Sequence, residues 1–124
     1  SASGKLFLAQ MTPAQRKRLL EHVPLDRYTD RTITSLTALE REIETVRTEG
    51  YAMDNEEFLP GLFCLAVLVP APAGRRSNTG IAIQAPALRL SHDKVPLLLP
   101  ALRRAADAIA AIDQSALPAA RNSA

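Results

Sequence analysis

Three acidic side chains, Asp54, Glu56 and Glu57, lie between two segments that both have the composition of buried structure. A carboxylate in such surroundings is costly unless it is hydrogen-bonded or paired with a cation. The residues leave three interpretations open. The acids can cap and solvate a turn, where such side chains are common. Asp54 can instead extend into a ligand pocket, or Asp54 and Glu56 can form an acid–base pair of an enzyme.

The first residues of the chain offer a second polar feature. Ser1, Ala2, Ser3 and Gly4 are all small, and they open a helix predicted for residues 1–10. The start of a helix has backbone N–H groups without acceptors, and small side chains allow an anion to approach them closely. A plain helix cap made by Ser1 or Ser3 explains the same residues.

Other chemistry has little support in the sequence. No Gly-rich phosphate loop follows a predicted strand, and no nucleophile elbow is present. The two histidines, His22 and His92, are far apart and lack partners at metal-ligand spacing, so we expect neither a metal nor another cofactor. Cys64 is the single cysteine, which excludes an intrachain disulfide. It is expected to act as a small apolar residue, and it can line a pocket together with Leu62, two positions away on the same face.

Length and charge restrict the class of protein. A chain of 124 residues suits one domain, and we predict that it covers residues 1–116, followed by a disordered tail at 117–124. The net charge of +2 is too small for a DNA-binding domain acting alone. No apolar run approaches the roughly 20 residues of a membrane span, so we expect no membrane partner. Because the chain begins with Ser1, the numbering can start inside a longer natural protein.

Two further helices are predicted before the acidic cluster. One begins at the cap Thr12, with Pro13 and Gln15 completing a capping box, and continues to about His22. Its basic run, residues 16–18, is interpreted as a solvated face. After a loop at residues 24–34, a second helix covers residues 35–49 and ends at Gly50. This helix carries one apolar stripe, made by Leu36, Leu39, Ile43 and Val46.

The rest of the chain predicts a sheet and a final helix. Residues 51–53, 62–69 and 78–84 have the pattern of strands, and the second is apolar throughout, which indicates a strand covered on both faces. The short connection after residue 69 favours antiparallel pairing of the last two strands. In the last strand, Ala82 and Gln84 share one face. Residues 91–113 predict a helical segment that becomes regular from about Leu97, so the fold class is α+β, with helices packed on an antiparallel sheet.

Four sequence segments in register resemble one family. They are Ser-Gly-Lys-Leu-Phe-Leu-Ala (residues 3–9), Tyr-Thr-Asp-Arg-Thr-Ile-Thr (28–34), Glu-Gly-Tyr-Ala-Met-Asp-Asn-Glu-Glu (49–57) and Pro-Gly-Leu-Phe-Cys-Leu-Ala (60–66). The chain is similar to the latter part of the effector-binding domain of IclR-type bacterial transcriptional regulators. The resemblance implies a GAF-like or profilin-like sheet, and it implies that the winged helix-turn-helix and the first part of the effector domain are missing, which would leave one sheet edge unpaired.

The resemblance also implies a ligand site. The family's pocket residues correspond to Ala2 and Ser3 at the helix start, the acid Asp54, and four strand positions, which are Leu62, Cys64, Ala82 and Gln84. The last two positions are often serines in relatives that sense small acids. With Ala82 and Gln84 in their place, we expect a hydroxylated or aromatic carboxylate rather than a keto acid of two or three carbons.

The resulting hypothesis is a cytoplasmic, non-enzymatic sensor of a small carboxylate. It would assemble as a homodimer or homotetramer and contact DNA only through the missing winged helix-turn-helix domain. Two alternatives remain at this point. One is an enzyme domain that uses the Asp54 and Glu56 pair, and the other is a dimerisation module without a ligand.

Overall fold

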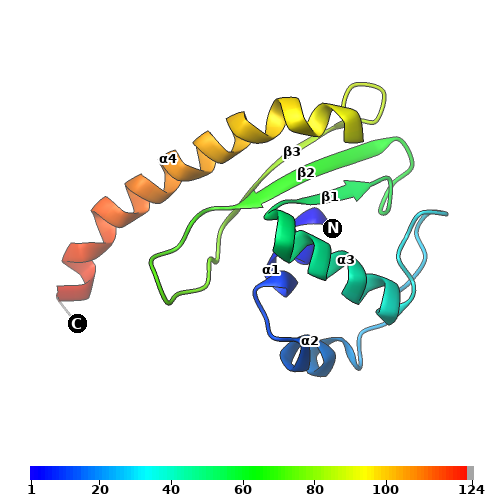
Figure 1. The fold of residues 1–124 in the computed structure, drawn as a ribbon, viewed down its shortest axis with the longest axis horizontal. Helices are drawn as coiled ribbons and strands as arrows, with labels where there is room; N and C mark the ends of the chain where they lie inside the picture. The colour runs from blue at the N-terminus through cyan, green and yellow to red at the C-terminus, as the bar shows by residue number, and fades with distance from the viewer. Residues whose placement is uncertain (123–124) are drawn as a thin grey trace.

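The computed structural model describes the backbone of residues 1–122 and the side chains of residues 1–112. Four α-helices, one short 3-10 helix and three strands follow one another along this part of the chain (Figure 1). They are α1 (Ala2–Ala9), α2 (Pro13–Leu20), α3 (Leu36–Glu49), β1 (Ala52–Asn55), β2 (Leu62–Leu68), β3 (Gly80–Pro86), η1 (His92–Lys94) and α4 (Val95–Asn122).

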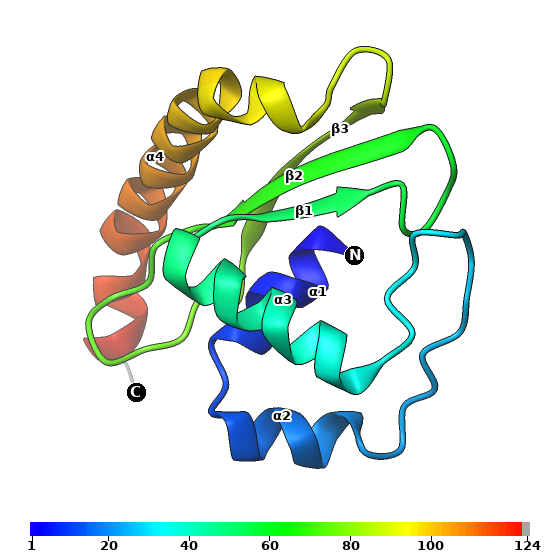
Figure 2. The same ribbon diagram turned by 45° about the vertical axis from the view of Figure 1, so that its right-hand side comes forward.

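The three strands form one antiparallel sheet in the order β1-β2-β3. The helix α4 crosses one face of this sheet, whereas α1 and α3 cover the other and α2 lies beyond them (Figures 1 and 2). This arrangement confirms the predicted α+β class. It also confirms that β2 is covered on both faces, because its side chains belong alternately to two separate apolar clusters.

The larger apolar cluster lies between the sheet and α4. From β2 it takes Phe63, Leu65 and Val67, and from α4 it takes Leu102 and Ala106, all almost fully buried. The helix is preceded by the 3-10 turn η1, which agrees with the irregular winding predicted before Leu97, although α4 becomes regular two residues earlier.

The smaller cluster lies between the sheet and α1. Its buried members are small or compact side chains: Ala2, Leu6, Val46, Ala52 and Ala66. Because alanines on both the helix and the strands meet here, the backbone of α1 can approach the sheet closely. The first turn of α1 is therefore held next to β1 and β2.

The helix ends follow the predicted signals. Ser1 caps α1, Thr12 and Gln15 form a complete capping box at α2, and Ser35 caps α3. Gly50 ends α3 in the left-handed region with φ of 77°, where a residue without a Cβ is favoured. The helix α2 ends at Leu20, two residues before the predicted end.

Strand β3 begins and ends two residues later than predicted. The residues before it are held in a local turn, in which Thr79 donates its backbone N–H to Ser77 Oγ. Ser77 is also fixed to the end of α1, because its backbone N–H and C=O both bond the side chain of Gln10. These bonds keep residues 77–79 out of the regular strand.

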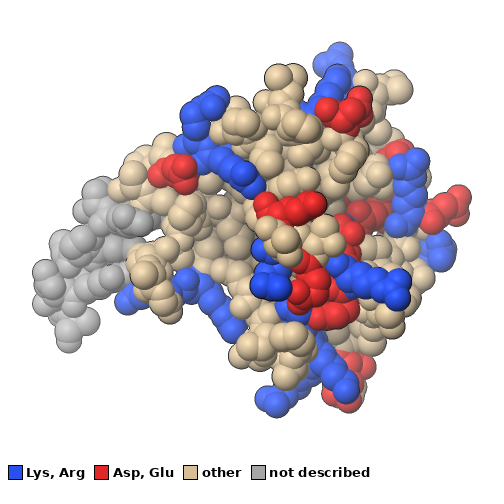
Figure 3. Space-filling view, viewed as in Figure 1, with Lys and Arg blue, Asp and Glu red and all other residues tan. Residues whose placement is uncertain are grey.

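The predicted domain boundary at residue 116 and the disordered tail at 117–124 stay predictions. The helix α4 is described to Asn122, while residues 123–124 lie outside the described residues. Within the described part of the chain, none of the helices combines the length and the apolar character that a bilayer crossing requires. Acidic and basic side chains are interspersed on the face seen in Figure 3.

Candidate functional site

Three polar or polarisable side chains form a row across the sheet. Asp54 of β1 lies opposite Cys64 of β2, and Cys64 lies opposite Gln84 of β3. Since directly opposed residues of paired strands point to the same face, the row is on the side of the sheet that α1 covers. Ala82 occupies the neighbouring row on this face, opposite Ala66.

Burial falls steadily along this row. The Asp54 side chain is only 8% exposed and Cys64 is half-buried, whereas Gln84 and Ala82 are exposed on the edge strand β3. Leu62, next to Cys64 on the same face of β2, is also half-buried. The structure thus brings Asp54, Cys64 and Gln84 together as a row, while Ala82 and Gln84 stay open to solvent in the described chain.

The first turn of α1 lies beside the buried end of the row. Ser1 Oγ accepts a hydrogen bond of 3.1 Å from the backbone N–H of Gly4. Within the described residues, the backbone N–H groups of Ala2 and Ser3 have no acceptor, as expected for the first residues of a helix. Two N–H groups are therefore available to an anion at this position.

The Cys64 thiol lies directly opposite Asp54 in the strand register. Burial raises the pKa of this thiol, and the negative charge of Asp54 raises it further.

Asp54 also shapes the turn that follows β1. Its Oδ1 accepts a hydrogen bond of 2.9 Å from the backbone N–H of Glu57. No other donor among the described residues reaches this carboxylate, so it keeps free acceptor capacity. Both interpretations of Asp54 that the sequence left open are therefore compatible with its position: it caps the turn, and it lines the cavity described below.

Glu56 has a structural role in the same turn. It adopts the left-handed conformation, with φ of 57°. One carboxylate oxygen accepts from the backbone N–H of Gly61 at 2.8 Å, and the other pairs with Arg31 at 3.0 Å. A carboxylate held by these two partners is not directed at Asp54, which argues against an acid–base pair of Asp54 and Glu56.

Lys5 is a buried cation at the site that sequence analysis missed. Its side chain is 4% exposed, and Nζ donates to the backbone oxygen of Met53 at 2.7 Å and to the carboxylates of Glu57 and Glu42. These bonds tie α1 to β1, to the acidic turn and to α3. Its position three residues after Ala2, on the same face of the predicted helix, was the available signal.

Arg16 is a second buried cation, and here the sequence interpretation was wrong. The predicted solvated face of residues 16–18 holds for Lys17 and Arg18, which are exposed, but the Arg16 side chain is fully buried. Its guanidinium bonds Glu40 and Glu44 of α3, and this pairing raises its pKa despite the opposing effect of burial. The partners lie 24 and 28 residues away, so no local pattern could reveal them.

A cavity of about 250 Å³ opens between α1, the sheet and the loop that precedes α3. Asp54, Glu57, Ser1, Gly4 and Lys5 form its polar side. The remaining walls are mainly apolar: Leu8, Leu20, Pro24, Leu25, Ile33, Leu39, Tyr28 and Phe58 line them, with Asp26 and Thr32. Of the seven site residues expected from sequence, Asp54 alone is in this lining. Ala2 and Ser3 are next to the lining residues Ser1 and Gly4 in the chain. The lining does not include the four strand residues, Leu62, Cys64, Ala82 and Gln84, which lie on the face of the sheet that carries Asp54.

A larger and shallower groove of about 870 Å³ lies between α2 and α3. Its lining combines Pro13, Leu20 and Leu36 with charged side chains such as Lys17 and Glu40. None of the residues predicted for the site lies in it. We therefore base the candidate site on the smaller cavity, where the polar groups converge.

The histidines do not contribute to this site. His92 lies at the start of η1, where its Nδ1 is 3.3 Å from the sulfur of Met53. Among the described residues, no group of three or more His, Cys, Asp or Glu side chains could hold a metal ion.

Comparison with known proteins identifies the family. The family described as "Bacterial transcriptional regulator IclR C-terminal" matches residues 1–111, nearly the whole chain. The chain belongs to this family. The IclR resemblance expected from four sequence segments is therefore confirmed.

Individual IclR relatives agree with this assignment. The chain is 40% identical over 83 residues to the HTH-type transcriptional regulator BhcR of Paracoccus denitrificans, covering 67% of this chain and 29% of that protein. It is 46% identical over 69 residues to the HTH-type transcriptional regulator KdgR of Escherichia coli, covering 56% of this chain and 26% of KdgR. The crystal structure of the KdgR C-terminal domain superimposes with a TM-score of 0.77 at 40% identity, covering 87% of this chain and 65% of that domain.

Two conclusions follow from these relatives. They are named as regulators of transcription, so this IclR domain is not an enzyme, and the alternative of an Asp54–Glu56 acid–base pair is excluded. The chain also spans less than a third of the length of the curated relatives it matches.

Proposed function

We propose that this IclR domain senses a small carboxylate, which binds between the first turn of α1 and the row formed by Asp54, Cys64 and Gln84. One observation carries the proposal. A nearly buried carboxylate, Asp54, lines a cavity with mainly apolar walls, and Ser1 and Gly4 of the adjoining helix start line the same cavity. A small number of polar groups in an apolar concavity is typical of ligand sites.

The chemistry of the site supports an acid with a second polar group. The N–H groups of Ala2 and Ser3 favour the ligand's carboxylate, because they add to the positive end of the α1 dipole. Asp54 is an acceptor when ionised, so it would meet a hydroxyl or amine of the ligand. Leu62 and Cys64 provide an apolar surface beside it, at the centre of the sheet.

The edge strand supports a ligand larger than a keto acid of two or three carbons. Ala82 offers no hydrogen-bonding side chain, whereas Gln84 offers both a donor and an acceptor on a longer stem. Both residues are exposed in the described chain, so they remain accessible to a bound molecule. We therefore propose a hydroxylated or aromatic carboxylate as the effector.

Regulation would follow from unequal affinity of the effector for different assemblies. In this proposal the cytoplasmic protein is a homodimer or homotetramer, and an amino-terminal winged helix-turn-helix domain outside this chain contacts DNA. A ligand that binds one arrangement more tightly shifts the population toward it and so changes DNA binding. No membrane contact is part of this proposal.

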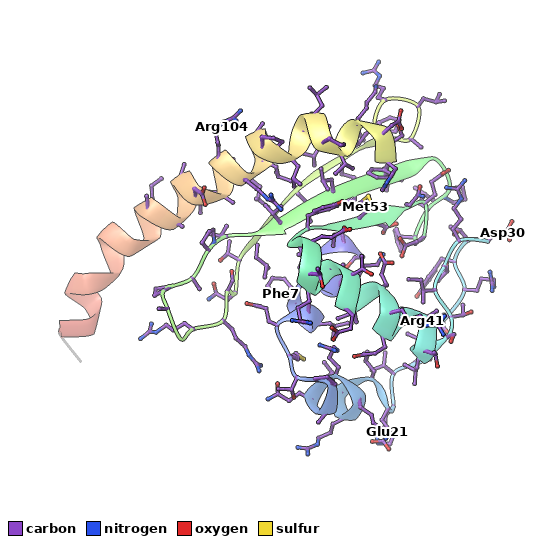
Figure 4. The ribbon with its side chains drawn as sticks, viewed as in Figure 1. Phe7, Glu21, Asp30, Arg41, Met53 and Arg104 are labelled. Atoms are coloured by element: carbon purple, nitrogen blue, oxygen red, sulfur yellow. The ribbon has the colours of Figure 1, made fainter. Side chains whose placement is uncertain are left out.

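A thermal-shift panel of organic acids on the full-length protein tests the proposal. An acid present at 100 times its dissociation constant should add about 2.7 kcal/mol to the free energy of unfolding. Asp54→Asn should reduce the response to hydroxylated acids, and Gln84→Ala should reduce the response to the larger acids. Asp30→Asn is the matched control, because Asp30 is exposed at the outer tip of its loop (Figure 4).

The outcomes separate the parts of the proposal. If pyruvate stabilises the protein more than every larger acid and Gln84→Ala changes nothing, the proposed ligand class is wrong. If no acid in the panel changes the melting temperature, the domain is a dimerisation module without an effector, and the sensing function itself is wrong.

A further inference from the structure

Two aromatic rings from distant parts of the chain meet where the cavity opens to solvent. Tyr28 belongs to the loop before α3, and Phe58 belongs to the turn after β1. Their ring centroids are 5.6 Å apart, and the ring planes are tilted by 52°. We call these two residues the aromatic pair. Both line the cavity that contains Asp54.

The aromatic pair is unusually exposed for such large apolar side chains. Tyr28 is 62% exposed and Phe58 is 60% exposed. An aromatic side chain buries roughly 150–250 Å² in a core, so a protein gives up considerable stabilisation when two of them stay at the surface. Residues that line a cavity and are also open to solvent lie at its mouth.

Polar contacts hold the two aromatic segments together. Thr29 donates its hydroxyl to the backbone oxygen of Glu56 at 2.6 Å, and the Thr32 hydroxyl donates to the backbone oxygen of Glu57. Arg31 bonds the side chain of Asn55 at 3.1 Å and pairs with Glu56. The loop is thus fixed to the acidic turn by residues directly after Tyr28 and directly before Phe58.

These hydrogen bonds order the backbone next to both rings in the absence of a ligand. The hydroxyl of Thr32 also accepts from the backbone N–H groups of Tyr28 and Thr29, which fixes the backbone that carries the first ring. Phe58 directly follows the two residues whose carbonyl oxygens are held. A recognition surface that is already ordered loses little conformational entropy on binding.

We propose that the aromatic pair selects the body of the effector, favouring a flat, aromatic acid over a short aliphatic one. The inference rests on the proposed function, because the carboxylate of the ligand is assigned to the start of α1. A ligand anchored there would occupy the cavity that Leu8, Leu39 and Ile33 line together with the aromatic pair. Its far end then meets the faces and edges of Tyr28 and Phe58.

The volume agrees with a compact aromatic ligand. Sites for drug-sized molecules usually measure about 300–1,000 Å³, so a cavity of about 250 Å³ suits a single ring with a carboxylate. The two rings are not parallel, and a third ring can therefore stack on one while it meets the edge of the other. A keto acid of three carbons has no ring with which to stack on either side chain.

Calorimetry on the full-length protein with two probes, benzoate and pyruvate, tests the inference. Tyr28→Leu and Phe58→Leu keep apolar volume but remove the ring, and each should weaken benzoate binding about fivefold while pyruvate binding changes less than twofold. Tyr28→Phe and Phe58→Tyr keep both rings and should bind benzoate like the wild type. Leu59→Ala is the matched control, because Leu59 is 52% exposed next to Phe58 but is not in the cavity lining.

The same measurements show which claim fails. If wild-type protein binds benzoate and the two leucine variants bind it equally well, the aromatic pair does not select the ligand, although the proposed function survives. If wild-type protein binds pyruvate but not benzoate, this inference and the proposed ligand class are both wrong, while the sensing of a small carboxylate survives. If it binds neither probe and no other organic acid, the proposed function and this inference both fail.

Discussion

Replacing Arg16 tests whether a buried guanidinium holds the first two helices to α3. Its side chain is fully buried, and its N–H groups bond two carboxylates and two backbone carbonyls. The carboxylates belong to Glu40 and Glu44, and the carbonyls belong to Leu8 and Met11 at the end of α1. Arg16→Met removes every donor and keeps much of the apolar volume.

The cost can be worked from the partners. Glu40 and Glu44 remain about 40% exposed, so water can replace the lost donors at little cost. The Leu8 oxygen keeps the backbone N–H of Met11 as a donor, so the Met11 oxygen is the carbonyl that loses its partner, at a cost of about 1–3 kcal/mol. We therefore expect Arg16→Met to lower the free energy of unfolding by about 2 kcal/mol.

Urea unfolding followed by circular dichroism measures this change. Arg18→Met is the matched control, because Arg18 is exposed on the same helix and its loss should cost less than about 0.5 kcal/mol. In a Glu40→Gln background, Arg16→Met should cost less, because the two residues are coupled. If Arg16→Met and Arg18→Met differ by less than about 1 kcal/mol, Arg16 does not hold the helices together.

Three further predictions concern single positions. Gly50→Ala should cost about 1 kcal/mol in urea unfolding, because φ is 77° although no atom would lie within 3.5 Å of the added Cβ. Asp54→Asn should speed iodoacetamide labelling of Cys64 at pH 8, because it removes a negative charge that raises the pKa of the thiol. An unchanged labelling rate would show that Asp54 does not act on the thiol. The pKa of Glu44 is lowered from 4.5, first by its hydrogen bond with Arg47. The ionised carboxylate therefore stabilises the fold above pH 4.5, and this contribution is lost as the pH falls below that value. Glu44→Gln should weaken the pH dependence of the free energy of unfolding in this acidic range.

The sequence alone determined the elements whose causes are local. The caps at Thr12, Ser35 and Gly50 depend on residues within three or four positions, and all three are found as predicted. Strand β2 could be recognised as covered on both faces because its apolar residues are continuous and so occupy both faces of the strand. The family could also be recognised from the sequence, because each of the four segments that resemble it is an unbroken run of residues.

Tertiary structure alone decided which polar groups meet. The register that aligns Asp54 with Cys64 and Gln84 depends on strand pairing, and the two-residue shift of β3 comes from a contact with Gln10, directly after α1. The burial of Arg16 depends on a partner helix more than 20 residues away. A buried charge is tolerated only where partners compensate the cost of its desolvation. The partners of Arg16 are far away in the sequence, so the residues around Arg16 could not reveal them. For the same reason, the contact between Tyr28 and Phe58 could be found only in the folded chain.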